Sequence, residues 1–328
     1  MTLKAPFPWF GGKSRAASLV WERFGDVPNY VEPFAGSLAT LLLRPHEAKT
    51  ETVNDKDAYL VNFWRAVQAD PEAVAAWACD PINEADLHAR HLWLLAQGDF
   101  RERMIADPHH FDAKIAGWWV WGLCSWIGTG WCVIRERGDG RPSLQLPHLG
   151  DAGRGVHRKL PHLGNAGRGV HRKLPHLGDA GRGVALAAYL GQLAERLHGV
   201  RVACGDWTRV LGDSVTHKHG MTAVLLDPPY DDGEMEYSAG GAGIAGAVRD
   251  WALANGGHRK LRIALCGYEG DHPMPDSWEC VAWKARGGYG SQGDGAGRDN
   301  AKRERIWFSP ACLRPQRSLF DALPDVSA

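Results

Sequence analysis

Short apolar segments typical of strands alternate with helical segments at both ends of this 328-residue chain, and this alternation constrains the fold most. The expected strands are residues 30–32, 52–55, 200–203, 223–226, 262–266 and 305–309. The expected helices between them are residues 37–43, 58–69, 185–197 and 244–255. Strands that alternate with helices predict an α/β fold, a parallel doubly wound sheet with helices on both faces.

The middle of the chain interrupts this alternation. Residues 71–127 predict helices, punctuated by Pro71, Pro81 and Pro108. Residues 128–147 carry several glycines between strand-forming residues, which suits a hairpin or a loop. We therefore expect a discontinuous domain built from residues 1–70 and 185–315. A region inserted at 71–184 and a tail at 316–328 complete the chain.

A 14-residue repeat occupies residues 146–184. LPHLGDAGRGVHRK is followed by LPHLGNAGRGVHRK and by a third, partial copy. The period is shorter than that of solenoid units, and the Pro and Gly content predicts loops. The repeats hold seven Lys or Arg side chains and two Asp in a chain of zero net charge. They predict a local basic patch suited to phosphates, although a solvated expansion without a role is the alternative.

Composition excludes several protein classes. No apolar run reaches the roughly 18 residues of a membrane span, and the Trp-rich segment 115–127 predicts a buried helix. No charged leader precedes an apolar stretch, so we expect a cytoplasmic protein without membrane association. The seven cysteines are scattered and form no CxxC pair, so we expect neither a disulfide framework nor a metal site.

Polar motifs follow several predicted strands, where ligands bind in open α/β sheets. Glu32-Pro33-Phe34-Ala35-Gly36 offers a glycine that lets the backbone approach a ligand and a helix start with free N–H groups, although an ordinary turn is the alternative. Asn54-Asp55 ends the next strand, where an acid can accept both hydroxyls of a ribose or instead cap a helix.

Two further motifs have the same ambiguity. Asp206-Trp207 can accept a hydrogen bond from an adenine amine beneath an apolar ring, or can cap the strand end. Pro8-Trp9-Phe10-Gly11-Gly12-Lys13 suits a loop that closes over a flat or anionic ligand, or a flexible N-terminal loop.

Asp227-Pro228-Pro229-Tyr230 is the strongest signal, because it directly follows an apolar strand. The two prolines remove backbone donors and stiffen the chain. The Asp227 carboxylate and the Pro228 carbonyl are then two fixed acceptors, suited to an exocyclic ring amine that donates two N–H groups. Tyr230 offers a face on which the ring can stack.

In the order of these motifs the chain resembles the Dam-like family of DNA adenine N6-methyltransferases. The resemblance covers about residues 5–65 and 186–310, and residues 304–309 are similar to the last strand of that family. It implies a Rossmann-like methyltransferase sheet and an inserted target-recognition region. It also implies S-adenosylmethionine as cofactor and double-stranded DNA as partner, with no obligate protein partner. Enzymes of this kind act in DNA methylation, including restriction–modification.

The resemblance also implies roles for particular residues. The cofactor-binding residues would be Trp9, Gly11, Gly12, Lys13, Glu32, Phe34, Gly36, Asp55, Asp206 and Trp207. Among these, Asp55 would hold the ribose hydroxyls and Asp206 the adenine amine, while Lys13 would also lie near DNA. Leu38 stands where the family usually has a second glycine, so we expect it to narrow the cofactor pocket.

The catalytic residues would be Asp227, Pro228, Pro229 and Tyr230, which would hold an adenine flipped out of the duplex. Arg135 and Arg137 near a hairpin tip would read bases, and Arg154, Arg158 and Lys159 would contact phosphates. The alternatives are an amino-methyltransferase acting on RNA or on cytosine in DNA, and a catalytically inactive DNA-binding relative.

Overall fold

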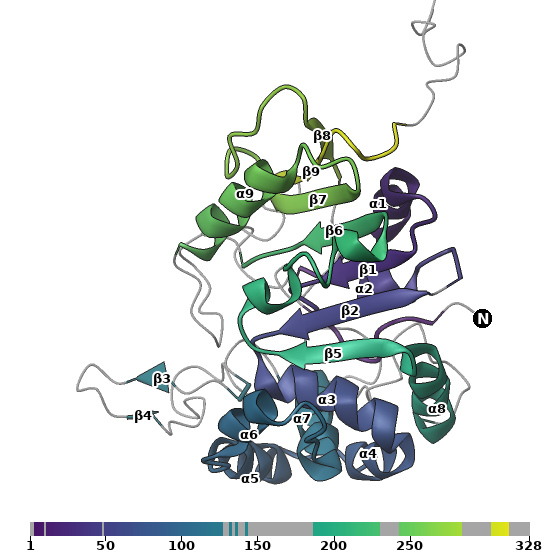
Figure 1. The fold of residues 1–328 in the computed structure, drawn as a ribbon. Coiled ribbons are helices and arrows are strands. Elements are labelled where there is room, and N and C mark those ends of the chain that lie inside the picture. The colour runs from purple at the N-terminus through teal and green to yellow at the C-terminus, as the bar shows by residue number, and fades with distance from the viewer. Residues whose placement is uncertain are drawn as a thin grey trace, which may run out of the picture.

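A seven-stranded sheet is the centre of the computed structural model, which describes residues 3–9, 11–47, 49–126, 131–132, 135–136, 142–143, 186–229, 243–283 and 303–314 (Figure 1). The strands are β1 (Asn29–Glu32), β2 (Thr50–Asp55), β5 (Val200–Cys204), β6 (Thr222–Leu226), β7 (Leu261–Tyr268), β8 (Glu279–Ala282) and β9 (Glu304–Phe308). Their order across the sheet is β5-β2-β1-β6-β7-β9-β8. The predicted α/β fold is confirmed as a Rossmann-like methyltransferase fold.

One strand differs from the predicted parallel sheet. β9 runs antiparallel to both β7 and β8, whereas β5, β2, β1, β6 and β7 pair in parallel. The predicted parallel sheet is therefore confirmed for most strands, and β9 is the antiparallel exception. β8, which was not predicted, is a short strand whose side chains are only partly buried or exposed, so it lacks a continuous apolar run.

The helices that cover the sheet are α1 (Ala17–Phe24), α2 (Ala39–Leu42), α3 (Ala58–Ala69), α8 (Leu186–Leu197) and α9 (Ile244–Asn255). α3 and α9 have the predicted bounds, whereas α1 was not predicted. The inserted region adds α4 (Pro71–Ala78), α5 (Glu84–Leu95), α6 (Phe100–Ala106) and α7 (Ala113–Ser125). Pro71 occupies the first turn of α4, where its missing N–H costs nothing, and the side chain of Asp70 caps that helix.

The strands send alternate side chains into two separate cores, one on each face of the sheet. Tyr30 of β1 and Leu225 of β6 belong to the larger core, which contains side chains of α1, α3 and α8. Their neighbours Val31 and Val224 belong to the smaller core, with side chains of α9. This period of two is the reason that helices cover both faces.

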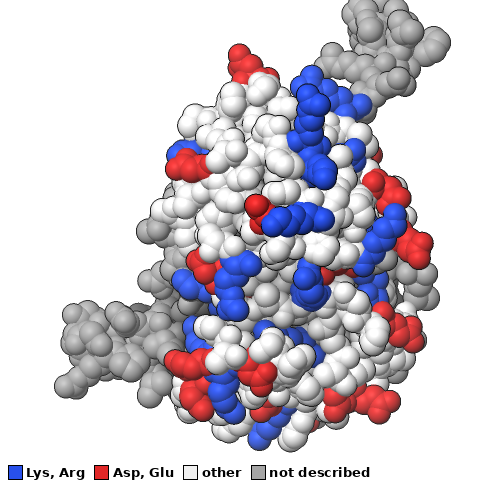
Figure 2. Space-filling model, viewed as in Figure 1, with Lys and Arg blue, Asp and Glu red and all other residues white. Residues whose placement is uncertain are grey.

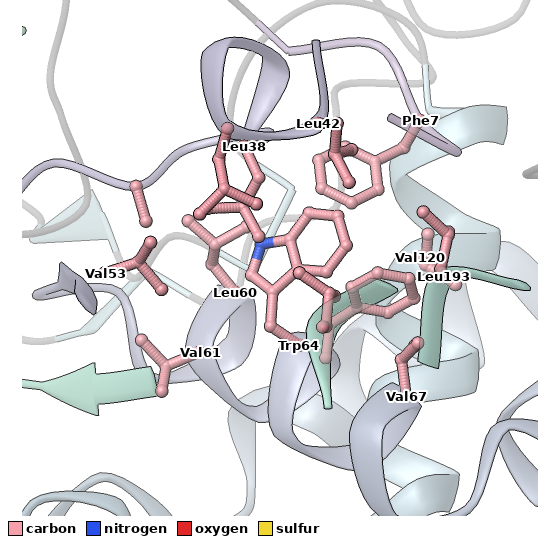
Figure 3. Packing of buried hydrophobic residues seen from close by; sticks show 14 of the residues in the cluster. Phe7, Leu38, Leu42, Val53, Leu60, Val61, Trp64, Val67, Val120 and Leu193 are labelled. Carbon is pink, nitrogen blue, oxygen red and sulfur yellow. The ribbon is translucent and has the colours of Figure 1, made fainter. Parts of the chain in front are cut away.

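Figure 3 shows part of the larger core around Trp64, whose indole lies among aliphatic side chains from several elements. Leu38, also shown there, is fully buried and adopts a left-handed backbone conformation with φ of 55°. Its side chain thus faces the core, so the expectation that it narrows the cofactor pocket was wrong. The left-handed residue also delays the start of α2 to Ala39, later than the predicted 37.

The inserted helices lie at the β5 end of the sheet (Figure 1), where α4 and α7 pack against α3 and α8. β3 (Arg135–Glu136) and β4 (Pro142–Ser143) form an antiparallel pair, as the predicted hairpin requires. The repeats at 146–184, the glycine-rich stretch 287–297 and the tail at 316–328 lie outside the described residues. Within the described part, no helix has the length and apolar character needed to cross a bilayer.

Candidate active site

The strand order reverses between β1 and β6, and this reversal positions the candidate site. From β1 the chain builds the sheet outward through β2 and β5, and from β6 it builds through β7 in the other direction. Crevices in α/β sheets form beyond the carboxyl ends of the strands at such a reversal. Four predicted acids follow these ends: Glu32 on β1, Asp55 on β2, Asp206 after β5 and Asp227 after β6.

Asn54 joins the turns that follow β1 and β5. Its buried side-chain amide donates to the carbonyls of Pro33 and Gly205, each at 3.0 Å. The backbone carbonyl of Asn54 accepts from the N–H of Ala35 at 2.8 Å. Because one amide ties both neighbouring turns, the three strand ends form a single rigid edge.

The Asp55 carboxylate lies at the centre of this edge. One oxygen accepts from the N–H of Gly36 at 3.1 Å and the other from the N–H of Asp57 at 2.9 Å. Burial raises the pKa of Asp55 to about 6, although the two backbone donors oppose this shift. Each carboxylate oxygen has a second lone pair, so Asp55 can accept further hydrogen bonds.

Position 36 requires a glycine for two reasons, its backbone conformation and the close approach of the Trp9 indole. Its φ is 46°, and a Cβ there would lie 2.6 Å from the indole nitrogen of Trp9. The indole of Trp64 donates to the Gly36 carbonyl at 3.1 Å from below. Two tryptophans therefore hold the turn after β1, and Trp9 covers it as a partly exposed ring on the larger-core face.

Phe34 and Trp207 form a stacked pair on the opposite face. Their ring centroids are 6.2 Å apart and the planes differ by 25°. Phe34 follows β1 and Trp207 follows β5, so the pair spans the end of β2 between them. Both rings are partly exposed, which leaves a flat apolar surface beside Asp55.

Asp206 is exposed and caps η1 (Trp207–Val210). Its carboxylate accepts from the hydroxyl of Thr208 at 2.5 Å and from the N–H of Thr208 at 3.0 Å. These two bonds lower the pKa of Asp206. The capping alternative therefore describes its role in the protein without ligand, and its link to adenine stays a prediction.

Lys13 reaches the end of β6. Its Nζ lies 2.9 Å from Oδ1 of Asp227 and donates to the Gly11 carbonyl at 2.7 Å. A tight turn delivers it, since the Gly12 N–H donates to the Trp9 carbonyl and Gly11 has φ of 70°. The ring of Trp283 lies 5.7 Å from the same ammonium. The predicted cofactor lysine is thus ion-paired with the predicted catalytic carboxylate.

The Lys13–Asp227 ion pair is largely buried. Lys13 is 4% exposed, while the side chain of Asp227 is 21% exposed. Burial by itself would lower the pKa of Lys13, but the nearby Asp227 carboxylate outweighs it and raises that pKa above the usual value, with smaller contributions from Cys266 and Glu304. Lys13 therefore carries a full positive charge at neutral pH.

Glu32 is buried beneath this edge. The Tyr30 hydroxyl donates to its Oε2 at 3.0 Å. Burial raises the pKa of Glu32 well above its usual range, and the negative charges of Asp227, Glu51 and Asp55 add to the shift. The Tyr30 bond opposes it only in part, so the site contains one acid that resists ionisation.

The structure brings together most of the predicted site, namely the Trp9 to Lys13 turn, Glu32, Phe34, Gly36, Asp55, Asp206, Trp207 and Asp227 with Pro228 and Pro229. Tyr230, Arg137, Arg154, Arg158 and Lys159 lie outside the described residues, and Arg135 is described only as backbone in β3. Within the ranges described, no group of three His, Cys, Asp or Glu side chains could hold a metal ion.

Sequence reasoning missed three residues around Lys13. Cys266 on β7 and Glu304 on β9 are buried and act electrostatically on the ammonium, and Trp283 faces it. They are distant in sequence from Lys13 and from Asp227. Only the pairing of β7 with β6 and with β9 brings them near, and no local pattern signals that pairing.

Comparison with known families is decisive for the N-terminal part. Residues 9–90 match the model of the D12 class N6 adenine-specific DNA methyltransferases. This segment of the chain is therefore similar to the adenine methyltransferases of that class. No curated protein matches the chain in a sequence search. The matched segment of the methyltransferase contains the Trp9 turn, Lys13, Glu32, Gly36 and Asp55.

The family match establishes an enzyme of DNA adenine N6 methylation, and the resemblance to Dam-like enzymes is thereby confirmed. DNA is its substrate and a methyl donor is required. Asp227 lies outside the matched segment. The Lys13–Asp227 ion pair joins it to that segment, so residues from both halves of the chain meet at one edge of the sheet.

Proposed function

We propose that the methyltransferase transfers a methyl group from S-adenosylmethionine to N6 of an adenine flipped out of duplex DNA at a specific sequence. The observation that carries this proposal is the Lys13-held Asp227 carboxylate, which precedes Pro228 at the end of β6. β6 lies directly beside β1, whose end bears the Gly36 turn. An acceptor pair for an amine and a cradle for a donor are thus neighbours.

The residues at the β1, β2 and β5 ends fit S-adenosylmethionine. Asp55 keeps lone pairs for ribose hydroxyls, and the Phe34–Trp207 pair offers a flat apolar surface for an adenine ring. The Trp9 indole lies close against Gly36, where a Cβ would be, and so forms one wall of this turn. When bound, the cofactor supplies a methyl group activated by its positively charged sulfur. Asp206 can exchange its Thr208 bonds for an exocyclic amine.

Asp227 and Pro228 would orient the target amine. Its lone pair is conjugated with the ring, so the nitrogen is a weak nucleophile in the planar form. Two acceptors that take its two hydrogens favour a pyramidal nitrogen with its lone pair directed at the methyl group. The new N–C bond forms as the S–C bond breaks, and the nitrogen then loses one proton, which the Asp227 carboxylate can accept.

Lys13 would act through Asp227 and not on the base directly. Its ammonium lies 2.9 Å from Oδ1 of Asp227 and fixes the direction of the carboxylate. An ionised acceptor stabilises the positive charge that develops on the amine during transfer. Burial raises the pKa of Glu32, which disfavours a second negative charge beside this pair.

We propose that the inserted region and the β3–β4 hairpin select the DNA target. Lys and Arg side chains alternate with acidic ones over the described surface in Figure 2, which gives this face a mixed charge. Base readout by Arg135 and Arg137 and phosphate contacts by Arg154, Arg158 and Lys159 remain part of the proposal. Tyr230 would stack on the flipped base and offset about 1–3 kcal/mol of the unstacking cost.

The test is expression in a host that lacks other adenine methylases, followed by modification-sensitive sequencing of its DNA. We expect N6-methyladenine at one recurring sequence motif. Methylcytosine, or methylated RNA with unmodified DNA, would transfer the function to those substrates. Soluble protein with no methylated nucleic acid would refute the proposal.

Asp227→Ala separates the two halves of the site. We expect it to abolish transfer while the dissociation constant for S-adenosylmethionine, measured by calorimetry, changes little. Asp55→Ala is the matched variant and should instead weaken cofactor binding. If Asp227→Ala abolished cofactor binding, the assignment of Asp227 to the target base would be wrong.

A further inference from the structure

Trp131, which precedes the β3–β4 hairpin in the sequence, packs its ring into a gap on the surface of α7. It is 8% exposed, and its indole nitrogen donates to the carbonyl of Trp119 at 2.9 Å. The gap exists because residue 122 is glycine, since a Cβ there would lie 1.8 Å from the Trp131 ring. The Trp131 ring and the surface of α7 at Gly122 are therefore complementary in shape, and this fit fixes how Trp131 packs on the helix.

His91 of α5 fixes the next residue. Its Nδ1 accepts from the N–H of Cys132 at 3.3 Å. The imidazole stacks on Trp126 with centroids 5.0 Å apart and contacts the Trp131 ring at 5.4 Å. Burial lowers the pKa of His91 to about 4, with a further contribution from His88. The ring therefore stays neutral at physiological pH, which an accepting Nδ1 requires.

Cys132 adopts a conformation that the chain does not favour. Its φ is 56° although it is not glycine, and it is buried at 3% exposure. Such a conformation persists where surrounding contacts determine it. The Trp131 seat on one side and the His91 bond on the other supply those contacts, and together they direct the chain that leaves this point.

The hairpin starts a few residues later, since β3 begins at Arg135. Its strands are two residues each, and isolated two-stranded hairpins are marginally stable in water. In Figure 1 the hairpin lies on the side of the sheet toward which the arrowheads of β2 and β5 point, which is the side of the candidate site. A short hairpin in this place depends on its attachment for orientation.

We infer that Trp131, Gly122 and His91 form a positioning anchor that sets the β3–β4 hairpin relative to the active site, and thereby the affinity and selectivity for the DNA target. These three residues touch neither the target base nor the cofactor site described above. They act through the hairpin. The link from hairpin to DNA rests on the proposed function, whereas the link from anchor to hairpin rests on the short sequence distance between Cys132 and Arg135.

Gly122→Ala tests the anchor, because its methyl group occupies the space of the Trp131 ring. Gly117→Ala is a matched control on the same helix. A Cβ at Gly117 would lie 2.3 Å from Trp77 and 2.8 Å from the Val74 carbonyl, so it disturbs the packing of α7 on α4 and not the anchor. Trp131→Phe, which loses the bond to Trp119, is a milder second variant should Gly122→Ala fail to fold.

Two measurements separate positioning from stability. Initial rates with unmethylated genomic DNA as the varied substrate give KM and kcat, and sequencing of the product gives the ratio of methylation at target and near-target sites. We expect the anchor variants to raise KM for DNA by about tenfold or more, which corresponds to the loss of one base contact. We also expect them to lower the ratio of methylation at target sites to methylation at near-target sites. The dissociation constant for S-adenosylmethionine should stay unchanged. Gly117→Ala should leave KM and the ratio unchanged.

Hydrogen exchange tests the anchor without DNA. The amides of Arg135, Glu136 and Ser143 should exchange faster in Gly122→Ala or Trp131→Phe than in Gly117→Ala. If the anchor variants exchanged faster but the wild-type protein methylated no DNA, the anchor would be supported and the proposed function refuted. Equal exchange in anchor and control variants, or equal KM values for DNA, would overturn the anchor.

Discussion

Replacing Lys13 with methionine removes the positive partner of Asp227 and keeps most of the side-chain volume. The ion pair is 2.9 Å long, Lys13 is 4% exposed and Asp227 is 21% exposed. Removal of one partner from a buried pair costs about 3–5 kcal/mol. Water reaches part of the Asp227 carboxylate, so we expect Lys13→Met to lower the free energy of unfolding by about 2–3 kcal/mol.

Asp227→Asn should cost more than Lys13→Met. It leaves the ammonium as the unpaired charge, and that charge is the more deeply buried of the two. The double variant leaves neither charge. Its cost should therefore fall below the sum of the single costs by roughly 2 kcal/mol, within the range of directly contacting residues.

Urea unfolding of the four proteins gives this cycle, and single-turnover methyl transfer gives the catalytic effect. We expect Lys13→Met to slow transfer by at least about tenfold, since the Asp227 carboxylate is no longer held in one orientation. Cofactor affinity should change little. Lys13→Arg keeps the charge and is the control.

Two outcomes would contradict the predicted role of the Lys13–Asp227 pair. Additive stabilities in the cycle would show that the two side chains do not interact. A Lys13→Met enzyme that transfers methyl groups at the wild-type rate but binds S-adenosylmethionine poorly would instead place Lys13 in the cofactor site, as the sequence predicted.

Three other substitutions test separate features. Because the pKa of Asp55 is raised to about 6 in the folded protein, the folded state binds a proton more tightly than the unfolded chain does. The free energy of unfolding therefore falls by up to about 3 kcal/mol as pH rises from about 4 to 6. Asp55→Asn should remove this pH dependence in urea titrations. Glu51→Gln removes the partner of buried Arg44 and of Arg196, so calorimetry should show a loss of about 3–5 kcal/mol with kcat unchanged in the folded fraction; an unchanged stability would contradict it. Leu38→Gly should be about 1 kcal/mol more stable than Leu38→Ala, since glycine accepts φ of 55° and alanine does not; the opposite order would refute strain at this residue.

Local patterns determined much of the fold. α3 and α9 have the bounds that apolar spacing and capping residues predict, and every predicted strand exists within a few residues. β9 runs antiparallel to β7 and β8, and this direction depends on the pairing, which the residues of a five-residue strand do not specify. α1 was missed although it places apolar side chains at helical spacing, at Ala17, Val20, Trp21 and Phe24.

The site shows the same division. The sequence by itself predicted which residues lie at one edge of the sheet, because Gly36, Asp55 and Asp227 each stand at or just after the end of an apolar strand and parallel strands end at a common edge. Only the tertiary structure decided which of these residues meet. Lys13 was assigned to the cofactor, yet the sheet order β2-β1-β6 and the turn at Gly11 bring its ammonium to Asp227. Charges attract through space over a few ångströms, and a sequence records only separation along the chain.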